Sequence, residues 1–266
     1  MLTAAKRNLC LIGQYFKFNL ASAMEYRGSF WLQVFGMAIN NASFIFFWWV
    51  AFTKIGTAVA GYTFRDIMFI WALSASSFGL SKVLFGNADR LSRIIMTGEL
   101  DNYLLQPRNV LINVISSRTQ VSAWGDLGYG YLLVLLTNGF NLGSLGLFTL
   151  FVILGAVFMS AMSAIYHSLT FFLGNAEKLA NIAFEGAINF CIYPDRIYTG
   201  FVRALIYSAI PAGFITHIPL AVFKSFNAGT LSLLILAAIG YAAFAFWLFH
   251  MGLKRYESGN LIVTRL

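Results

Sequence analysis

The side chains that could carry chemistry are few, and they do not form a catalytic pattern. The histidines His167, His217 and His250 lie on different segments, and no H-E-x-x-H motif is present. This spacing predicts neither a metal centre nor a hydrolase site. The phosphate-binding pattern G-x-x-x-x-G-K-[ST] is also absent. We therefore expect the chain to bind no ATP by itself and to need no cofactor of its own.

A polar, gently amphipathic segment occupies residues 87–107, between two apolar regions. Asn87 is expected to cap a helix that begins at the next residue. The spacing in that helix places apolar side chains on one face and polar side chains on another. The apolar face contains Leu91, Ile94 and Ile95, and the polar face contains Arg90, Arg93 and Thr97.

A second short helix is predicted after Gly98, which suits the left-handed residue that ends a helix. It is expected to contain Glu99, Leu100, Asp101, Tyr103 and Leu104 and to end before Pro107. Acids in its first turn are favourable for the helix dipole. The residues alone leave two interpretations open. The segment could lie on lipid headgroups as a surface elbow, or it could be a docking site for a partner protein.

Three polar residues within otherwise apolar regions are candidates for a substrate path, because ionisable groups inside a membrane are costly. Asp126 could instead form a structural pair with Arg118, eight residues earlier. Glu185 and Asn189 fall on a short helix, where the acid could face a cavity and attract a cationic substrate. The alternative for Glu185 is a buried acid satisfied by a neighbouring group.

The elements that position these residues must be membrane helices. Of the 266 residues, 59% are apolar and only 11% are charged, whereas soluble domains carry about 25% charged residues. The fold class is therefore all-α, a single polytopic domain over residues 1–266, because no polar stretch is long enough for a separate domain. The net charge of +8 is attributed to basic loops on one side of a membrane, and nucleic acid is not an expected partner.

Six transmembrane helices are predicted from apolar windows of about 20 residues. They cover residues 29–52, 66–86, 110–138, 144–173, 176–193 and 229–252. An amphipathic helix over 4–25 is expected in the membrane interface. Residues 194–224 contain Pro194, Pro211 and Pro219, so a re-entrant pair of half-helices is predicted there instead of a span.

Basic residues set the expected orientation. With the N-terminus inside, thirteen of the 18 lysines and arginines fall on cytoplasmic segments and five fall outside. The positive-inside rule therefore places both termini in the cytoplasm. The predicted location is a bacterial-type plasma (inner) membrane, and residues 87–107 are then cytoplasmic.

Several stretches resemble one known family. The quoted stretches are "TGELDNYLLQP" (97–107), "AMEYRGSFWLQ" (23–33), "IYPDRIY" (192–198), "IPAGFITHIP" (210–219) and "GLKRYESGN" (252–260). They are similar to segments of ATP-binding-cassette (ABC) transporter permeases of the type-2 exporter family. The resemblance extends over nearly the whole chain. It departs at Thr97, where the family often has a basic residue.

The resemblance implies a half-transporter whose ATPase is a separate polypeptide, which carries the ATP and Mg²⁺. Residues 87–107 would be the coupling segment on which this ATPase docks, and two permease subunits, identical or related, would form the pump. The expected cargo is a hydrophobic or amphiphilic molecule, such as a cationic drug, exported by alternating access. An ATP-independent secondary transporter or channel is the alternative, because broken helices suit it too.

Overall fold

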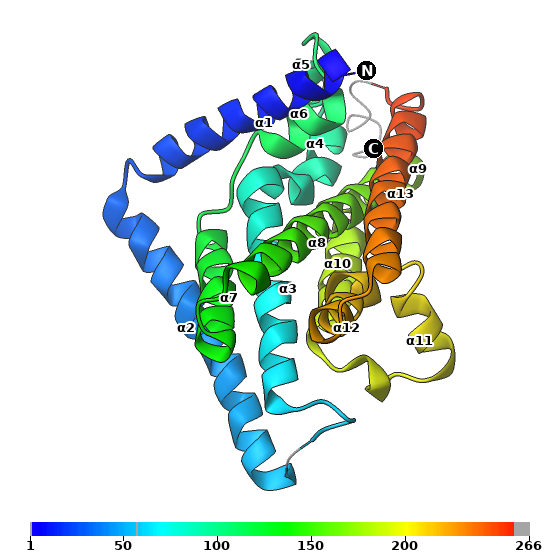
Figure 1. Ribbon diagram of the computed structural model, residues 1–266. Helices are drawn as coiled ribbons and strands as arrows, with labels where there is room; N and C mark the ends of the chain where they lie inside the picture. Colours follow the sequence, from blue (N-terminus) through cyan, green and yellow to red (C-terminus); the bar gives the residue numbers. More distant parts are fainter. Residues whose placement is uncertain (1, 57, 258–266) are drawn as a thin grey trace.

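The computed structural model describes residues 2–56 and 58–257, and every regular element in them is helical (Figure 1). The elements are α1 (Leu2–Ala23), α2 (Arg27–Ile55), α3 (Phe64–Phe85), η1 (Gly86–Arg90), α4 (Leu91–Met96), α5 (Asp101–Leu104), α6 (Val110–Ser116), α7 (Ala123–Asn138), α8 (Leu142–Ser168), α9 (Thr170–Leu173), α10 (Glu177–Ile192), η2 (Asp195–Ile197), α11 (Gly200–Ile206), η3 (Gly213–His217), α12 (Ile218–Lys224) and α13 (Ala228–Leu253). The all-α prediction is confirmed. The last three residues of the motif at 252–260 lie outside the described range.

Four helices are long and apolar enough to cross a membrane. They are α2, α3 with its continuation to Met96, α8 with its continuation to Leu173, and α13. Each lies within three residues of a predicted span at its start, which confirms the membrane class. Helices α7 and α10 have 16 residues each, or about 24 Å, which is short for a hydrocarbon core of about 30 Å. The six-span layout therefore stays a prediction.

The predicted continuous span over 110–138 is wrong. The structure divides it into α6 and α7, with a connector over 117–122 between them. The connector contains Arg118 and Gln120, and the backbone N–H of Gln120 donates to the Lys82 carbonyl at the end of α3. The chain breaks here because a run of serine, arginine, threonine and glutamine is too polar to continue an apolar helix.

Helix α3 is the centre of the bundle, and small residues bring its neighbours close. A Cβ on Gly130 of α7 would lie 2.3 Å from the Ala72 carbonyl oxygen, and one on Gly155 of α8 would lie 2.2 Å from Ser77 Oγ. Such contacts are typical of helix packing in lipid, where small side chains let backbones approach. By contrast, α2 and α13 bury little of their apolar surface within the chain. Both therefore present apolar faces to lipid or to another subunit.

Helix α1 leaves the bundle at an angle to α2, as the blue ribbon in Figure 1 shows. It meets the body of the protein through Tyr15, whose hydroxyl donates to Asn113, and through Asn19, whose amide donates to the Ser116 carbonyl. Leu9 and Phe18 are exposed on its other sides. The helix predicted over 4–25 is thus present, and its place in the membrane interface stays a prediction.

The proline-bearing region forms two short pieces. Helix α11 stands away from the bundle in Figure 1, whereas the π-helical turn η3 continues into α12, which packs against α3, α8 and α13. Pro194, Pro211 and Pro219 are buried. Pro219 lies in the first turn of α12. The re-entrant arrangement stays a prediction.

Candidate coupling site

Residues 86–107 form a folded elbow at the end of α3. The helix tightens into the 3₁₀ turn η1 and then continues as α4. Gly98 adopts φ +76°, and the Leu100 N–H turns back to the Ile94 carbonyl, which closes the end of α4. Helix α5 follows and ends at Leu104, before Pro107. The break predicted at Gly98 is therefore confirmed.

The capping role predicted for Asn87 is wrong. Its side chain donates to the Val114 carbonyl at 3.0 Å and to Ser117 Oγ at 2.8 Å, both at the end of α6. Tyr103 of α5 shares the same serine hydroxyl at 3.1 Å. A buried amide with two acceptors in a neighbouring helix gains more than it would as an exposed cap, so Asn87 ties the start of the elbow to α6.

The apolar face of the elbow is directed into the membrane bundle. Leu91, Ile94, Ile95 and Leu100 are buried in one cluster with side chains of α6, α8 and α13. Phe249 of α13 and Ala164 of α8 are members of that cluster. This face is occupied by the chain itself, so a partner protein could not reach it.

The opposite face is open to solvent. Its exposed members are Arg93, Thr97, Glu99, Asn102, Leu104, Leu105, Gln106, Pro107 and Arg108. Leu105 is 86% exposed. Arg90, Asp101 and Tyr103 are half-buried along the edge. Figure 1 places α4 and α5 at the end of the bundle where α1 begins and α13 ends.

An ion pair inside the bundle fixes the elbow to three helices. Lys82 of α3 is 1% exposed, and its Nζ lies 2.5 Å from Oδ1 of Asp89 in η1, which is 32% exposed. Asp89 also accepts from Ser163 Oγ of α8 at 2.8 Å. The Lys82 ammonium stands 4.1 Å from the centre of the Phe184 ring of α10, a favourable position for a cation over a ring.

The sequence did not predict this pair, because Lys82 was interpreted only as one of the basic residues that set the membrane orientation. The signal was a lysine and an aspartate seven residues apart, about two helical turns. A regular helix would leave them two turns apart along one face, and the 3₁₀ turn that brings them together is not visible in the pattern.

A second polar contact fixes α4 to the end of α8. Ser92 is fully buried, and its Oγ lies 2.8 Å from Nδ1 of His167. Ser92 Oγ also accepts from Thr170 Oγ1 at 2.8 Å. The elbow is therefore held to α3, α6 and α8 through both apolar packing and buried hydrogen bonds.

The candidate substrate-path residues do not meet in one place within the chain. Asp126 of α7 is buried and accepts from the Asn41 amide of α2 at 2.7 Å, so the predicted pair with Arg118 is wrong. Glu185 and Asn189 lie on the exposed side of α10, together with Leu179. A cavity that contains Glu185 must therefore include something outside this chain.

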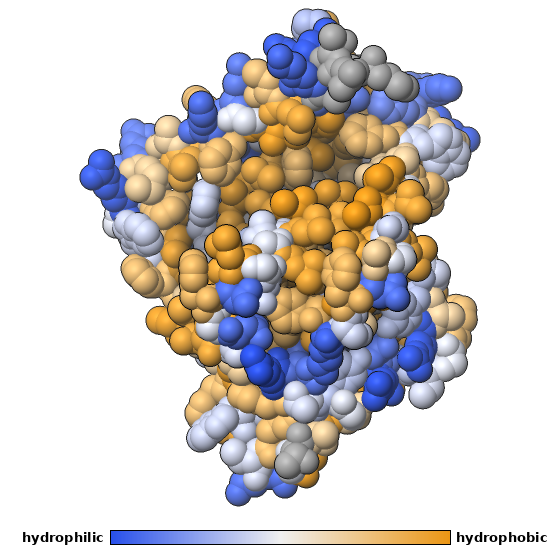
Figure 2. All heavy atoms as spheres, viewed as in Figure 1, coloured by the Kyte–Doolittle hydropathy of each residue, from blue (hydrophilic) through white to orange (hydrophobic). Residues whose placement is uncertain are grey.

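An apolar hollow is visible on the face of the molecule that Figure 2 shows, between α1 and α13. It encloses about 210 Å³. It is lined by Ile12, Phe85, Leu111, Ile112, Ile115, Val157, Ser160, Ala161, Ala164, Ala242, Ala245 and Phe246. Because its wall carries almost no polar group, the hollow suits hydrocarbon and gives no sign of a polar substrate.

Four long apolar helices, together with an elbow whose outer face is exposed and charged, are features of a polytopic membrane protein. Residues 38–259 match the family described as "ABC-2 family transporter protein", and the chain belongs to that family. Searches of curated proteins and of solved structures gave no match. Membership implies, in general, an ABC ATPase as partner.

Proposed function

We propose that this protein is the permease subunit of an ATP-driven ABC exporter, with the ATPase on a separate polypeptide that docks on the outer face of residues 86–107. The observation that carries the proposal is the division of that segment into two faces. Its apolar face is buried against α6, α8 and α13, and its charged face is exposed. The family match and the absence of a phosphate-binding motif support it.

The same division suggests how force would pass. The side chains of Arg93, Glu99 and Leu105 are exposed and therefore accessible to a partner. A partner that binds them would move the elbow when it changes conformation. The elbow is tied to α3 and α8 by Lys82 and Ser92, so the spans would follow. Transport then requires that the ATPase binds the two arrangements of the spans with different affinity.

We further propose that a second permease subunit completes the substrate path. The apolar faces of α2 and α13 are not covered by the chain, and Glu185 and Asn189 point outward from α10. Because α2 and α13 lie on opposite sides of the bundle in Figure 1, a second subunit would enclose the acid only if it packed beside α10. A hydrophobic or amphiphilic cation would find there both apolar walls and one negative charge.

The proposed topology has six passes, with both termini and residues 86–107 in the cytoplasm. It is supported by the common end of the bundle at which α1 begins, α13 ends and α4 and α5 lie. In this arrangement α7 and α10 cross as short helices. The membrane would have to thin locally, or polar side chains at their ends would have to reach the headgroups.

The test is co-purification. A tagged wild-type chain should retain an ATPase polypeptide that carries a phosphate-binding loop, and the complex should hydrolyse ATP. The Arg93→Glu/Glu99→Lys variant should lose that polypeptide while the permease stays folded. Lys54→Glu is the matched control, because Lys54 is exposed at the far end of α2. Transport by the purified chain without any ATPase would refute the proposal and favour the secondary transporter.

A further inference from the structure

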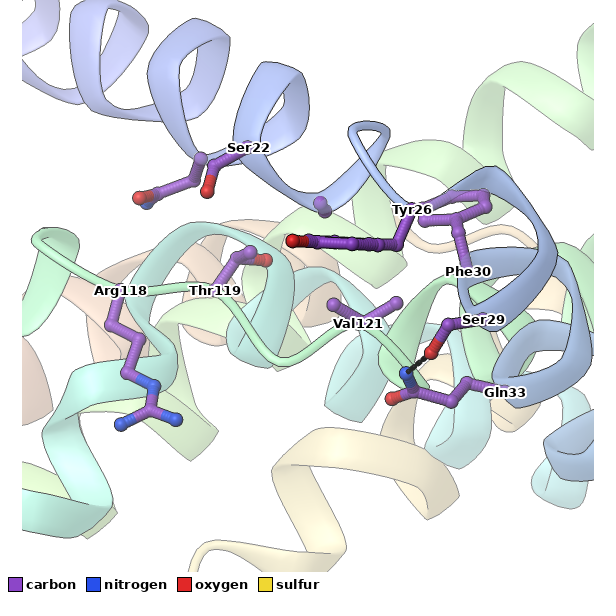
Figure 3. Close-up of a pocket in the computed structure, with 10 residues that line it drawn as sticks. Ser22, Tyr26, Ser29, Phe30, Gln33, Arg118, Thr119 and Val121 are labelled. Atoms are coloured by element: carbon purple, nitrogen blue, oxygen red, sulfur yellow. Dashed lines mark hydrogen bonds between the residues drawn. The ribbon is translucent and has the colours of Figure 1, made fainter.

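A cavity of about 320 Å³, lined mostly by residues with polar groups, lies at the joint between α1 and α2 (Figure 3). Its walls are the end of α1, the turn that leads into α2 and the connector between α6 and α7. The lining residues are Asn19, Ser22, Ala23, Tyr26, Ser29, Phe30, Gln33, Arg118, Thr119 and Val121. The volume is at the lower end of ligand cavities, which are typically about 300–1,000 Å³.

The lining is rich in hydrogen-bond donors and contains no acid. Arg118 is exposed at its edge and forms no ion pair with any described residue. The Thr119 hydroxyl is buried and has no hydrogen-bond partner within the described chain. Figure 3 shows Tyr26 extending across the cavity between Ser22 and the connector. A buried donor without a partner is costly, so this arrangement favours an anionic acceptor.

The position of the cavity indicates what carries that anion. It lies where α1, which leaves the bundle at an angle, meets the first residues of the long apolar helix α2. Directly beyond the lining residue Phe30, the side chains of Trp31, Leu32 and Phe35 are exposed. An occupant that fits both regions has an anionic head and hydrocarbon chains, which is the chemistry of a phospholipid.

We propose that the cavity binds the phosphate group of an anionic phospholipid. The Tyr26 hydroxyl contacts the phosphate directly, and the acyl chains follow the exposed Trp31 and Leu32 side of α2. Figure 3 shows the Arg118 guanidinium directed away from Tyr26, and the Thr119 hydroxyl is buried, so both side chains change rotamer to reach the phosphate. The lipid thereby holds α1, α2 and the connector together at the joint. The inference rests on the membrane class of the chain and does not depend on the exporter function proposed above.

The experiment uses the full chain, purified in detergent and depleted of lipid. Thermal unfolding midpoints are measured with added phosphatidylglycerol, phosphatidylcholine or inorganic phosphate, and retained lipids are counted by native mass spectrometry. In the wild type, phosphatidylglycerol should raise the midpoint more than phosphatidylcholine does. Arg118→Gln should weaken apparent binding of phosphatidylglycerol at least about tenfold, because it removes a charge-assisted contact. Arg118→Lys should restore part of it.

Arg108→Gln is the matched control, because Arg108 is exposed and does not line the cavity. It should keep the full preference for phosphatidylglycerol. If Arg118→Gln does not fold, Thr119→Val takes its place, since it removes the buried hydroxyl at nearly constant volume. Equal stabilisation by inorganic phosphate would overturn the lipid assignment in favour of a free anion. A wild type without preference between the two lipids, or an Arg118→Gln variant that keeps it, would overturn the site itself.

Discussion

Lys82 and Asp89 are buried to different degrees, so we expect the two single variants of this pair to lose different amounts of stability. Asp89→Asn leaves an ammonium group that is 1% exposed, with aromatic rings but no carboxylate beside it. Breaking a buried pair in this way costs about 3–5 kcal/mol. Lys82→Met leaves a carboxylate that is 32% exposed and still accepts from Ser163, so its cost should be smaller, about 2 kcal/mol.

The double variant Lys82→Met/Asp89→Asn should be far more stable than the sum of the single variants indicates. Methionine fills the space of the lysine stem, and the asparagine oxygen can still accept from Ser163. Replacing both partners of a buried pair is often close to neutral, within about 1 kcal/mol. The expected interaction energy between the two sites is at least about 4 kcal/mol, above the range of about 0.5–3 kcal/mol that is usual for residues in direct contact.

The assay is equilibrium unfolding of the purified chain by sodium dodecyl sulfate in mixed micelles, followed by tryptophan fluorescence. Lys54→Met is the control for loss of a lysine at an exposed position, and its effect should stay within about 0.5 kcal/mol. Additive single variants would show that the two groups do not act as a pair. A larger cost for Lys82→Met than for Asp89→Asn would refute the argument from burial.

Three further predictions concern packing and the loop side of the bundle. Gly130→Ala should destabilise the protein by about 1–3 kcal/mol, because the new Cβ would lie 2.1 Å from Ser76 Oγ. Gly128→Ala on the same helix is the control: its Cβ would meet open space, so this variant should be neutral or slightly stabilising. Equal effects of the two would contradict the close packing of α3 and α7. Leu100→Ala should cost about 2–5 kcal/mol, because the side chain is fully buried; a cost below about 1 kcal/mol would mean that the elbow is not seated on the bundle. Burial raises the pKa of Asp195, but the hydrogen bonds from two tyrosines outweigh it and hold the pKa below its ordinary value of 3.8. The resulting stability is fully present well above pH 3.8 and is lost as the pH falls through 3.8 and then through the lower folded pKa. Asp195→Asn should therefore weaken the dependence of the unfolding free energy on pH between about pH 5 and pH 2; an unchanged acid dependence would exclude Asp195 as its source.

Apolar windows predicted most of the helices because membrane helices have one dominant requirement, which is length in hydrocarbon. The spans predicted over 66–86 and 229–252 correspond to α3 and α13 within two residues at each end. The window over 110–138 failed because its average hydropathy hid a short polar break. The hydropathy averaged over twenty residues does not register individual hydrogen bonds. Such bonds, for example that from the Gln120 N–H to the Lys82 carbonyl, decide where the chain turns.

In residues 87–107, the local helix breaks and faces were predictable from the sequence, whereas the tertiary contacts were not. Gly98 was identified because a left-handed turn favours glycine, and the apolar stripe of Leu91 and Ile94 followed from helical spacing. Spacing alone could not tell whether that stripe meets a partner or the chain's own helices. Asn87 shows the same limit, because its acceptors lie about 30 residues away in sequence.

The two faces of the elbow differ in their surroundings, because one packs against the apolar bundle and the other is exposed. On the inner side, breaking a polar contact would leave the buried Lys82 ammonium or the buried Ser92 hydroxyl without its partner, so we expect these contacts to be costly to break. On the outer side, water satisfies Arg93 and Glu99 when no partner is present, so contacts there can form and break at little cost. Under the proposed function, a segment with fixed inner contacts and exchangeable outer contacts would transmit the ATPase's movement and still release the ATPase. The polar ties, more than the apolar stripe, are therefore the part of the elbow whose loss should uncouple the spans from it.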